Sequence, residues 1–180
     1  TPEGGFMEQK RLDELINFTL GKNISRLKNQ NVNIYTPEDF EKDLHSLADV
    51  NMICGCIINL IRSKASPIST ETQGKYITSN FLLCMFDQNE LDPWYFCYQF
   101  NEGKSLEQQI SKYHQGTTLS VKKLNIKSIG ELKIPMLEIE KQRQIGRLYR
   151  QSMIQKDLLE HQAENISRLA AETIRRIEED

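Results

Sequence analysis

The apolar residues of the chain fall into short clusters separated by polar stretches, which predicts a globular body of strands and short helices. Residues 52–61 are strongly apolar and rich in isoleucine, a pattern that favours a buried strand. Residues 76–86 form a second strand candidate, and residues 130–136 form a last one that ends at Pro135. A further apolar segment, 12–18, fits either a short helix or an edge strand.

Helix-start signals lie between these strand candidates. The Asp-Pro pair at 92–93 is expected to begin a helix, because aspartate accepts backbone N–H groups and proline suits the first turn. The Thr-Pro pair at 36–37 gives the same signal, although an ordinary turn also fits it. Ser105 and Gln108 have the spacing of a capping box, so another helix is expected there, ending near residue 116.

From about Ile139 onward the chain changes character and predicts one long helix. No proline follows, Gly146 is the only glycine, and residues that favour helices predominate. Roughly forty such residues would form a rod of about 60 Å. A stripe of residues at spacings of four and three begins there with the polar Ser152 and Lys156 and continues with small and apolar residues. We name this second part the seam: Leu159, Ala163, Ile166, Ala170, Thr173 and Ile177. Because so long a helix needs a partner to be stable, we expect the seam to bind another helix. A frayed, solvated tail after a short docking helix is the alternative.

These elements together predict an α+β fold in two parts. Residues 7–137 are expected to form a globular domain with a mixed β-sheet and short helices, and residues 138–180 a long helix of the coiled-coil type. Residues 1–6 are left outside the fold, with Met7 as the expected start. No apolar run approaches the roughly 20 residues of a membrane helix, and no secretory signal is recognisable. A cytoplasmic protein without membrane contact is therefore expected.

The net charge is only −2, but the charges are segregated along the chain. Residues 21–35 and 108–130 contain no Asp or Glu and carry several Lys and Arg residues. Arg62 and Lys64 form a third basic patch, at the start of a polar loop expected at 62–74. Such segregation is typical of a surface that meets phosphates, and chance clustering on solvated loops is the alternative.

The sequence contains no recognisable motif for catalysis or for nucleotide binding. The acidic residues between 38 and 43 fit the charged face of a helix better than a nuclease site. Four cysteines lie within apolar segments and are expected to be reduced and buried: Cys54, Cys56, Cys84 and Cys97. We therefore expect a non-catalytic protein that holds neither a cofactor nor a metal ion.

The segment that leads into the long helix resembles a passage of Type I restriction–modification specificity subunits. In that family a strand ending in Ile-Pro leads through a proline-rich turn and a Gln to a spacer helix, and residues 134–145 are similar. The order of shorter motifs upstream is also similar, at residues 12–25, 76–80, 92–95 and 115–119. One departure is that Leu137 and Glu138 stand where the family usually has two prolines.

The resemblance implies a DNA target-recognition domain followed by a spacer helix. In this family two spacer helices pair antiparallel and hold two recognition domains apart, so that each domain reads one half of a bipartite site. The helices bind methyltransferase (modification) subunits and, through them, restriction subunits. One domain and one helix are present here, so we expect a half-subunit or a truncated product. A homodimer, or a second half-subunit bound through the C-terminal helix, would complete it.

The basic loops carry the residues that we expect to contact double-stranded DNA, since Lys and Arg bind phosphates while Asn, Gln and Arg can read base edges. The expected phosphate contacts are Lys22, Arg26, Lys28, Lys122 and Lys123. The expected base contacts are Asn23, Ser25, Arg62, Lys64, His114, Gln115 and Thr118. One alternative is a protein-interaction scaffold that acts through its long helix without reading DNA. Another is the specificity module of a combined restriction–methylation enzyme.

Overall fold

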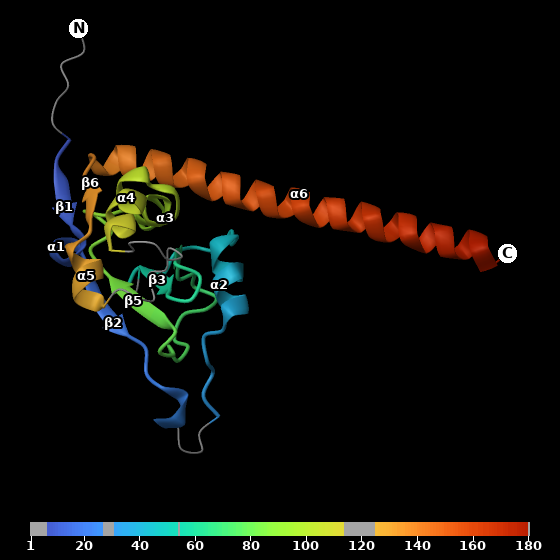
Figure 1. The fold of residues 1–180 in the computed structure, drawn as a ribbon, viewed down its shortest axis with the longest axis horizontal. Helices are drawn as coiled ribbons and strands as arrows, with labels where there is room; N and C mark the ends of the chain where they lie inside the picture. The colour runs from blue at the N-terminus through green and yellow to red at the C-terminus, as the bar shows by residue number, and fades with distance from the viewer. Residues whose placement is uncertain (1–6, 27–30, 54, 114–124, 180) are drawn as a thin grey trace, which may run out of the picture.

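A computed structural model describes residues 7–26, 31–53, 55–113 and 125–179. One long helix projects from a body of strands and shorter helices (Figure 1). The elements in chain order are β1 (Gln9–Arg11), α1 (Leu12–Leu15), β2 (Asn17–Leu20), the 3-10 turn η1 (Ile24–Arg26), α2 (Pro37–Leu44), β3 (Cys56–Asn59), β4 (Lys64–Pro67), β5 (Phe81–Met85), α3 (Pro93–Glu102), α4 (Lys104–Lys112), α5 (Ile126–Glu131), β6 (Lys133–Pro135) and α6 (Ile139–Glu179). The mixed α and β content expected from the sequence is confirmed.

Two antiparallel sheets form the framework of the body. The larger sheet has the strand order β2-β5-β3-β4, and the smaller one pairs β1 with β6. In the larger sheet Leu20 lies opposite Leu82, while Asn59 lies opposite both Phe81 and Lys64. The ends of β2 and β3 and the starts of β4 and β5 therefore meet at one edge, which we name the loop edge.

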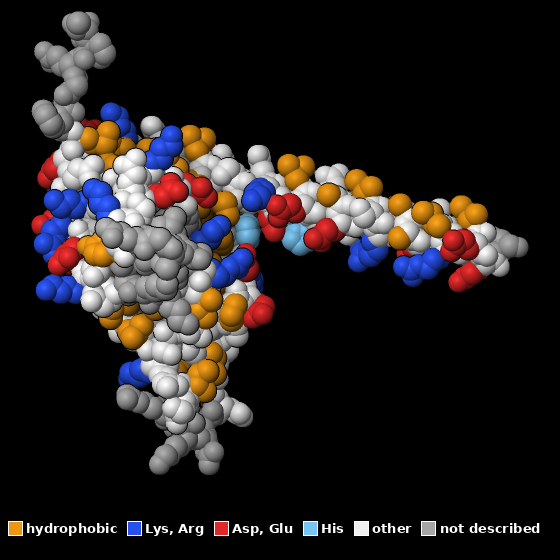
Figure 2. Space-filling view, in the orientation of Figure 1, with side chains coloured by type: hydrophobic (Ala, Val, Ile, Leu, Met, Phe, Trp, Pro, Cys, Tyr) orange, Lys and Arg blue, Asp and Glu red, His pale blue; other side chains and the backbone are white. Residues whose placement is uncertain are grey.

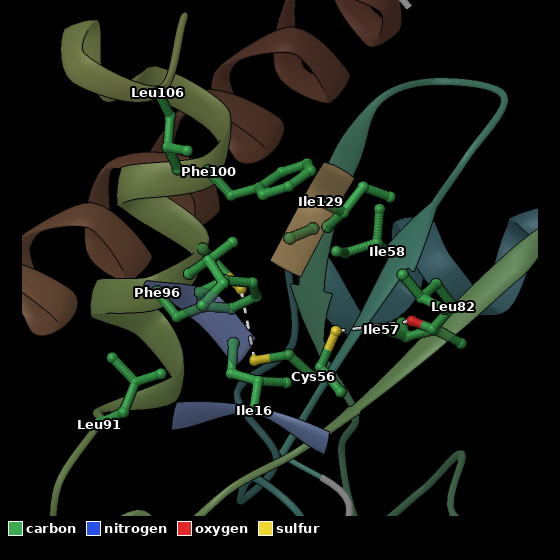
Figure 3. Packing of buried hydrophobic residues seen from close by; sticks show 14 of the residues in the cluster. Ile16, Cys56, Ile57, Ile58, Leu82, Leu91, Phe96, Phe100, Leu106 and Ile129 are labelled. Atoms are coloured by element: carbon green, nitrogen blue, oxygen red, sulfur yellow. Dashed lines mark hydrogen bonds between the residues drawn. The ribbon is translucent and has the colours of Figure 1, made fainter. Parts of the chain in front are cut away.

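The hydrophobic core lies between the larger sheet and α3. Phe96 and Phe100 of α3 point toward Cys56 and Ile58 of β3 (Figure 3). Seven of the ten residues of α3 are buried, because the sheet covers one side of this helix and α6 packs on another. The three cysteines that the structure describes are also buried and form no disulfide, as expected: Cys56, Cys84 and Cys97.

The two helix starts at Thr-Pro and Asp-Pro pairs are confirmed. The side chain of Asp92 accepts a hydrogen bond from the backbone N–H of Tyr95. Thr36 and Asp39 cap each other's backbone N–H groups, so the 36–37 pair begins α2 rather than an ordinary turn. The capping box at Ser105 was wrong, because α4 follows Gly103 and makes no side-chain cap. The helix ends at Lys112, before the expected end near residue 116.

Each of the three segments predicted as strands contains a strand, but the limits differ and β4 was missed. The apolar run 52–61 supplies only β3, since Met52 and Ile53 are 74% exposed in a turn that the side chain of Asn51 caps. The loop expected at 62–74 contains β4, whose inner residues are buried against α3. Contacts with a distant helix therefore turned a polar sequence into an edge strand.

The remaining segments combine helix and strand. Residues 12–18 supply both α1 and the start of β2, so each of the two alternatives is partly right. The strand expected at 130–136 is reduced to β6, because Gly130 belongs to α5 and packs beside Asp13. A side chain at Gly130 would collide with Asp13, which explains a glycine within this short helix.

The long helix expected from Ile139 onward is confirmed as the 41 residues of α6. Its first turns pack against α3, and the rest extends away from the body (Figure 1). Although α6 is long, none of the helices in the described residues is apolar enough to span a membrane.

Candidate nucleic-acid interface

The loop edge gathers segments that lie far apart in the sequence. The chain after β2 lies beside the start of β5 and the residues before it. The N–H of Gly21 donates a hydrogen bond of 3.0 Å to the carbonyl of Phe81, and the N–H of Lys22 donates one of 2.9 Å to the carbonyl of Ile77. The turn after β3 joins the same edge through a bond of 2.9 Å from the N–H of Leu60 to the carbonyl of Asn80. Two of the basic patches found in the sequence thus meet at one end of the sheet.

A close backbone approach brings the first basic segment to this edge. A side chain at Gly21 would lie 1.9 Å from the carbonyl oxygen of Thr78, so only glycine fits there. Beyond it, Lys22, Asn23 and Ser25 are exposed, and the side-chain oxygen of Asn23 accepts the N–H of Ser25. Three of the expected DNA contacts are therefore accessible on one short segment.

The turn between β3 and β4 carries two more expected contacts. The buried Asn59 accepts hydrogen bonds from the N–H groups of Ile61 and Arg62, both at 3.1 Å. Ser63 takes a positive φ of 53°, which few residues other than glycine adopt. The guanidinium of Arg62 forms an ion pair with Glu41 of α2. These constraints fix the tip of the turn, on which Arg62 and Lys64 are exposed.

The other expected contacts lie where the structure does not describe side chains. Arg26 ends η1, and only its backbone is described. Six further residues lie outside the described part of the chain: Lys28, His114, Gln115, Thr118, Lys122 and Lys123.

A cavity of about 610 Å³ opens at the loop edge and adds residues that the sequence did not identify as candidates. Aliphatic side chains line most of it, and Ser79, Asn125 and Lys127 add polar groups. Lys127 lies on α5 within the acid-free stretch 108–130, which is the signal that could have found it. Ser79 carries no comparable signal, because only strand pairing brings it to this edge.

The charges at the loop edge favour an anionic ligand. In the described part of the chain, Lys22, Lys64 and Lys127 make no ion pair, whereas Lys75 is bound to Asp39 at 2.8 Å. On the face shown in Figure 2, the coloured atoms at the lower tip of the body include a basic side chain and no acidic one. Among the described residues no group of His, Cys, Asp and Glu is arranged to hold a metal ion. The exposed lysines at this edge are side chains of the kind that bind phosphates.

The seam forms a second exposed surface. Leu159, Ile166 and Ile177 are each more than 60% exposed, and Leu148 extends the same stripe toward the body. Figure 2 shows hydrophobic side chains along the upper side of α6 and most charged ones along its lower side. The residues of α6 that are buried against the body, such as Gln142 and Tyr149, lie roughly 110° around the helix from the seam. The body therefore leaves the seam free along the whole helix.

Comparison with solved structures gives this architecture a family context. The HsdS subunit from Thermoanaerobacter tengcongensis matches 88% of this chain with a TM-score of 0.57 and 16% sequence identity. A structure of the assembly of a type I R-M system matches 96% with a TM-score of 0.53 and 16% identity. The chain shares the fold of Type I specificity subunits. The S subunit from M. genitalium also matches, at a TM-score of 0.48 and 14% identity.

The specificity-subunit fold covers this chain almost completely, but the chain spans less than half the length of these solved structures, from 40% to 44%. No protein-family model and no curated protein matches the chain. The resemblance stated from residues 134–145 is thus confirmed for the fold.

Proposed function

We propose that this chain reads one half of a bipartite DNA site as a specificity component of a Type I restriction–modification system. The observation that supports this most directly is the loop edge. In a chain with the specificity-subunit fold, segments that are basic and free of acids converge at one end of the sheet, where their side chains are exposed. Chance clustering on solvated loops would not require this convergence.

The loop edge would enter a groove of the double helix. Lys22 would bind a phosphate, together with Arg26, Lys28, Lys122 and Lys123. Asn23 would pair with an adenine edge and Arg62 with a guanine edge, since these side chains match the two hydrogen-bonding patterns. Ser25, Lys64, His114, Gln115 and Thr118 complete the proposed base contacts.

The chain would supply specificity only. Methyl transfer and cleavage would belong to methyltransferase and restriction subunits that bind α6, and the chain would act in the cytoplasm. In this proposal residues 7–137 form the recognition domain and residues 138–180 the spacer.

The seam supports a second copy of the chain as the direct partner. Leu159 and Ile166 lie at equal distances along the chain from the midpoint between Gln162 and Ala163, and so do Leu148 and Ile177. Two antiparallel copies centred on this midpoint would therefore place two apolar pairs opposite each other, Leu159 with Ile166 and Leu148 with Ile177. Ala163 would face Gln162, and Ala170 would face Gln155. Ser152 would face Thr173 in the same register, which pairs small polar residues as well.

This register also places the two bodies usefully for DNA. The two-fold axis runs perpendicular to both helices, and each body lies to the side of its own seam, so both bodies lie on the same side of the pair. Gly146 of one copy would face Glu179 of the other. The two attachment points would then be separated by about 33 residues, or roughly 50 Å of helix. We expect half-sites about 15 base pairs apart, centre to centre.

Fluorescence polarisation with duplex DNA at two salt concentrations tests the proposal. DNA reading requires binding that weakens steeply as salt rises, because Lys and Arg release counterions from the phosphates. Selection from a random duplex library, with the methyltransferase partner supplied, should then give a two-part motif. Failure to bind any duplex at low salt would instead support a scaffold that acts only through the exposed seam.

A further inference from the structure

The junction between α6 and the body is held by four residues of successive turns, Gln142, Gly146, Tyr149 and Arg150, which we name the clamp. None of them is among the proposed DNA contacts. They contact three different parts of the body: the start of α3, the end of α3 and the loop after α2. Their arrangement fixes the direction in which the helix leaves the body.

Gln142 joins two backbone segments, 90–92 and 137, through one side chain. Its amide oxygen accepts the N–H of Asp92 at 3.0 Å, and its amide nitrogen donates to the carbonyls of Glu90 at 3.0 Å and Leu137 at 2.8 Å. The residue is only 1% exposed. Replacing it with an apolar residue would leave these buried backbone groups unpaired, and a glutamate would lack the two donors.

Gly146 lets the two helices approach closely. A side chain there would lie 2.4 Å from a carboxylate oxygen of Asp92 and 2.9 Å from Cβ of Trp94. Because neither atom can move without displacing the start of α3, only glycine allows this packing.

Tyr149 and Arg150 extend the clamp to the loop edge and to α2. The ring of Tyr149 packs edge-on against Trp94 and Tyr98, and its hydroxyl accepts a hydrogen bond of 3.0 Å from Asn101. Asn101 in turn exchanges two hydrogen bonds with the backbone of Ala65, the residue after Lys64. Tyr149 is thus linked through one side chain to the strand that begins at the loop edge.

Arg150 closes the opposite side of the junction. Its guanidinium lies over the ring of Trp94, 5.6 Å from the centroid, and donates hydrogen bonds of 2.8 Å to the carbonyls of Ser46 and Ala48. The loop after α2 is therefore held against α6, and α2 in turn holds Arg62 through Glu41.

We propose that the clamp is a specificity determinant that sets the spacing between half-sites, without contacting DNA. This inference rests on the proposed function. A helix of 41 residues reaches about 60 Å, so a tilt of about 10° at the clamp would move its far end by about 10 Å, roughly three base pairs. If the junction is rigid, a helix of given length therefore allows only one distance between the two half-sites.

Selection from a duplex library with two randomised half-sites and a variable gap tests the clamp on the full chain. The variants are Gln142→Ala, the milder pair Tyr149→Phe with Arg150→Gln, and the control Gln151→Ala on the exposed face of α6. Clamp variants should keep the half-site motif of the wild type, while the share of the preferred gap falls by roughly threefold or more, as the loss of one hydrogen bond gives. The control should keep both.

Three outcomes separate this inference from the proposed function. An unchanged gap in variants that keep the half-site motif overturns the clamp alone. Loss of the motif in a variant that melts like the wild type also overturns it, because the clamp would then act on reading. If the wild type selects no motif, the proposed function itself fails. Should Gln142→Ala unfold, the double variant decides.

Discussion

The buried carboxylate of Asp43 accepts a hydrogen bond of 2.7 Å from the hydroxyl of Tyr35. The same carboxylate also accepts the hydroxyl of Thr72 at 2.7 Å and the N–H of Ser69. Burial and the charge of Asp43 raise the pKa of Tyr35, which keeps its hydroxyl a neutral donor. This network ties α2 to the segment after β4, and α2 carries the carboxylate of Glu41 that pairs with Arg62.

Asp43→Ala should therefore destabilise the fold by about 2–4 kcal/mol, because it leaves three buried donors without an acceptor. Urea unfolding followed by circular dichroism measures the change. Tyr35→Phe removes a single donor and should cost only about 1 kcal/mol. Equal midpoints for Asp43→Ala and the wild type would show that the network contributes nothing.

Arg62→Ala should weaken binding to the selected duplex more than binding to random DNA. The turn around Asn59 and Ser63 fixes Arg62, and a guanine contact from a fixed side chain is worth about 1–3 kcal/mol. Dissociation constants measured on both duplexes at one salt concentration give the comparison. Equal losses on the two duplexes would assign Arg62 to the phosphate backbone instead.

Lys22→Ala is expected to behave differently from Arg62→Ala. The side chain of Lys22 is exposed and makes no ion pair with the residues that the structure describes. The substitution should weaken binding to both duplexes alike and lower the salt slope by about one. A loss confined to the selected duplex would move Lys22 to the base contacts.

The antiparallel register of the seam can be tested by exchanging charges. Leu159→Glu should dissociate the dimer, because it places a carboxylate opposite the apolar Ile166 of the second copy. Adding Ile166→Lys should restore it, since each introduced carboxylate would then face an introduced ammonium group. Sedimentation equilibrium measures both states. In a parallel dimer the double variant would place like charges together, so continued dissociation would refute the register.

Asp92 predicts a pH dependence of stability. Burial raises the pKa of its carboxyl, and the bonded N–H of Tyr95 and the nearby Arg143 and Arg147 only partly offset this. A raised pKa means that the folded state prefers the protonated acid. Stability should therefore fall as pH rises from the ordinary carboxyl range through the raised pKa, and change no further above it.

Asp92→Asn should remove this decrease while keeping the cap of α3, because asparagine also accepts the N–H of Tyr95. Thermal melts between about pH 4 and pH 7 give the comparison. The same slope in both proteins would assign the pH dependence to another group.

Much of the fold and part of the candidate site could be predicted because the signals are local. The caps at Thr36 and Asp92 act within one helical turn, and the composition after Ile139 specifies a helix whatever surrounds it. The basic segments around Lys22 and Arg62 were likewise visible as stretches without acids. Sequence alone thus determined the α+β class, the long helix and most of the surface charge.

Contacts between distant segments decided the rest. Only pairing with β3 and packing against α3 make a strand of residues 64–67. Strand pairing brings Ser79, and packing of α5 on α1 brings Lys127, to the cavity that Leu20 also lines. Met52 is exposed although it is apolar, and Gln142 is buried although it is polar. Burial at each position depends on which element packs against it. Hydrophobic and hydrogen-bonding energies are gained from neighbours in space, so the sequence specified the elements while tertiary packing placed them at one edge and fixed the direction of α6.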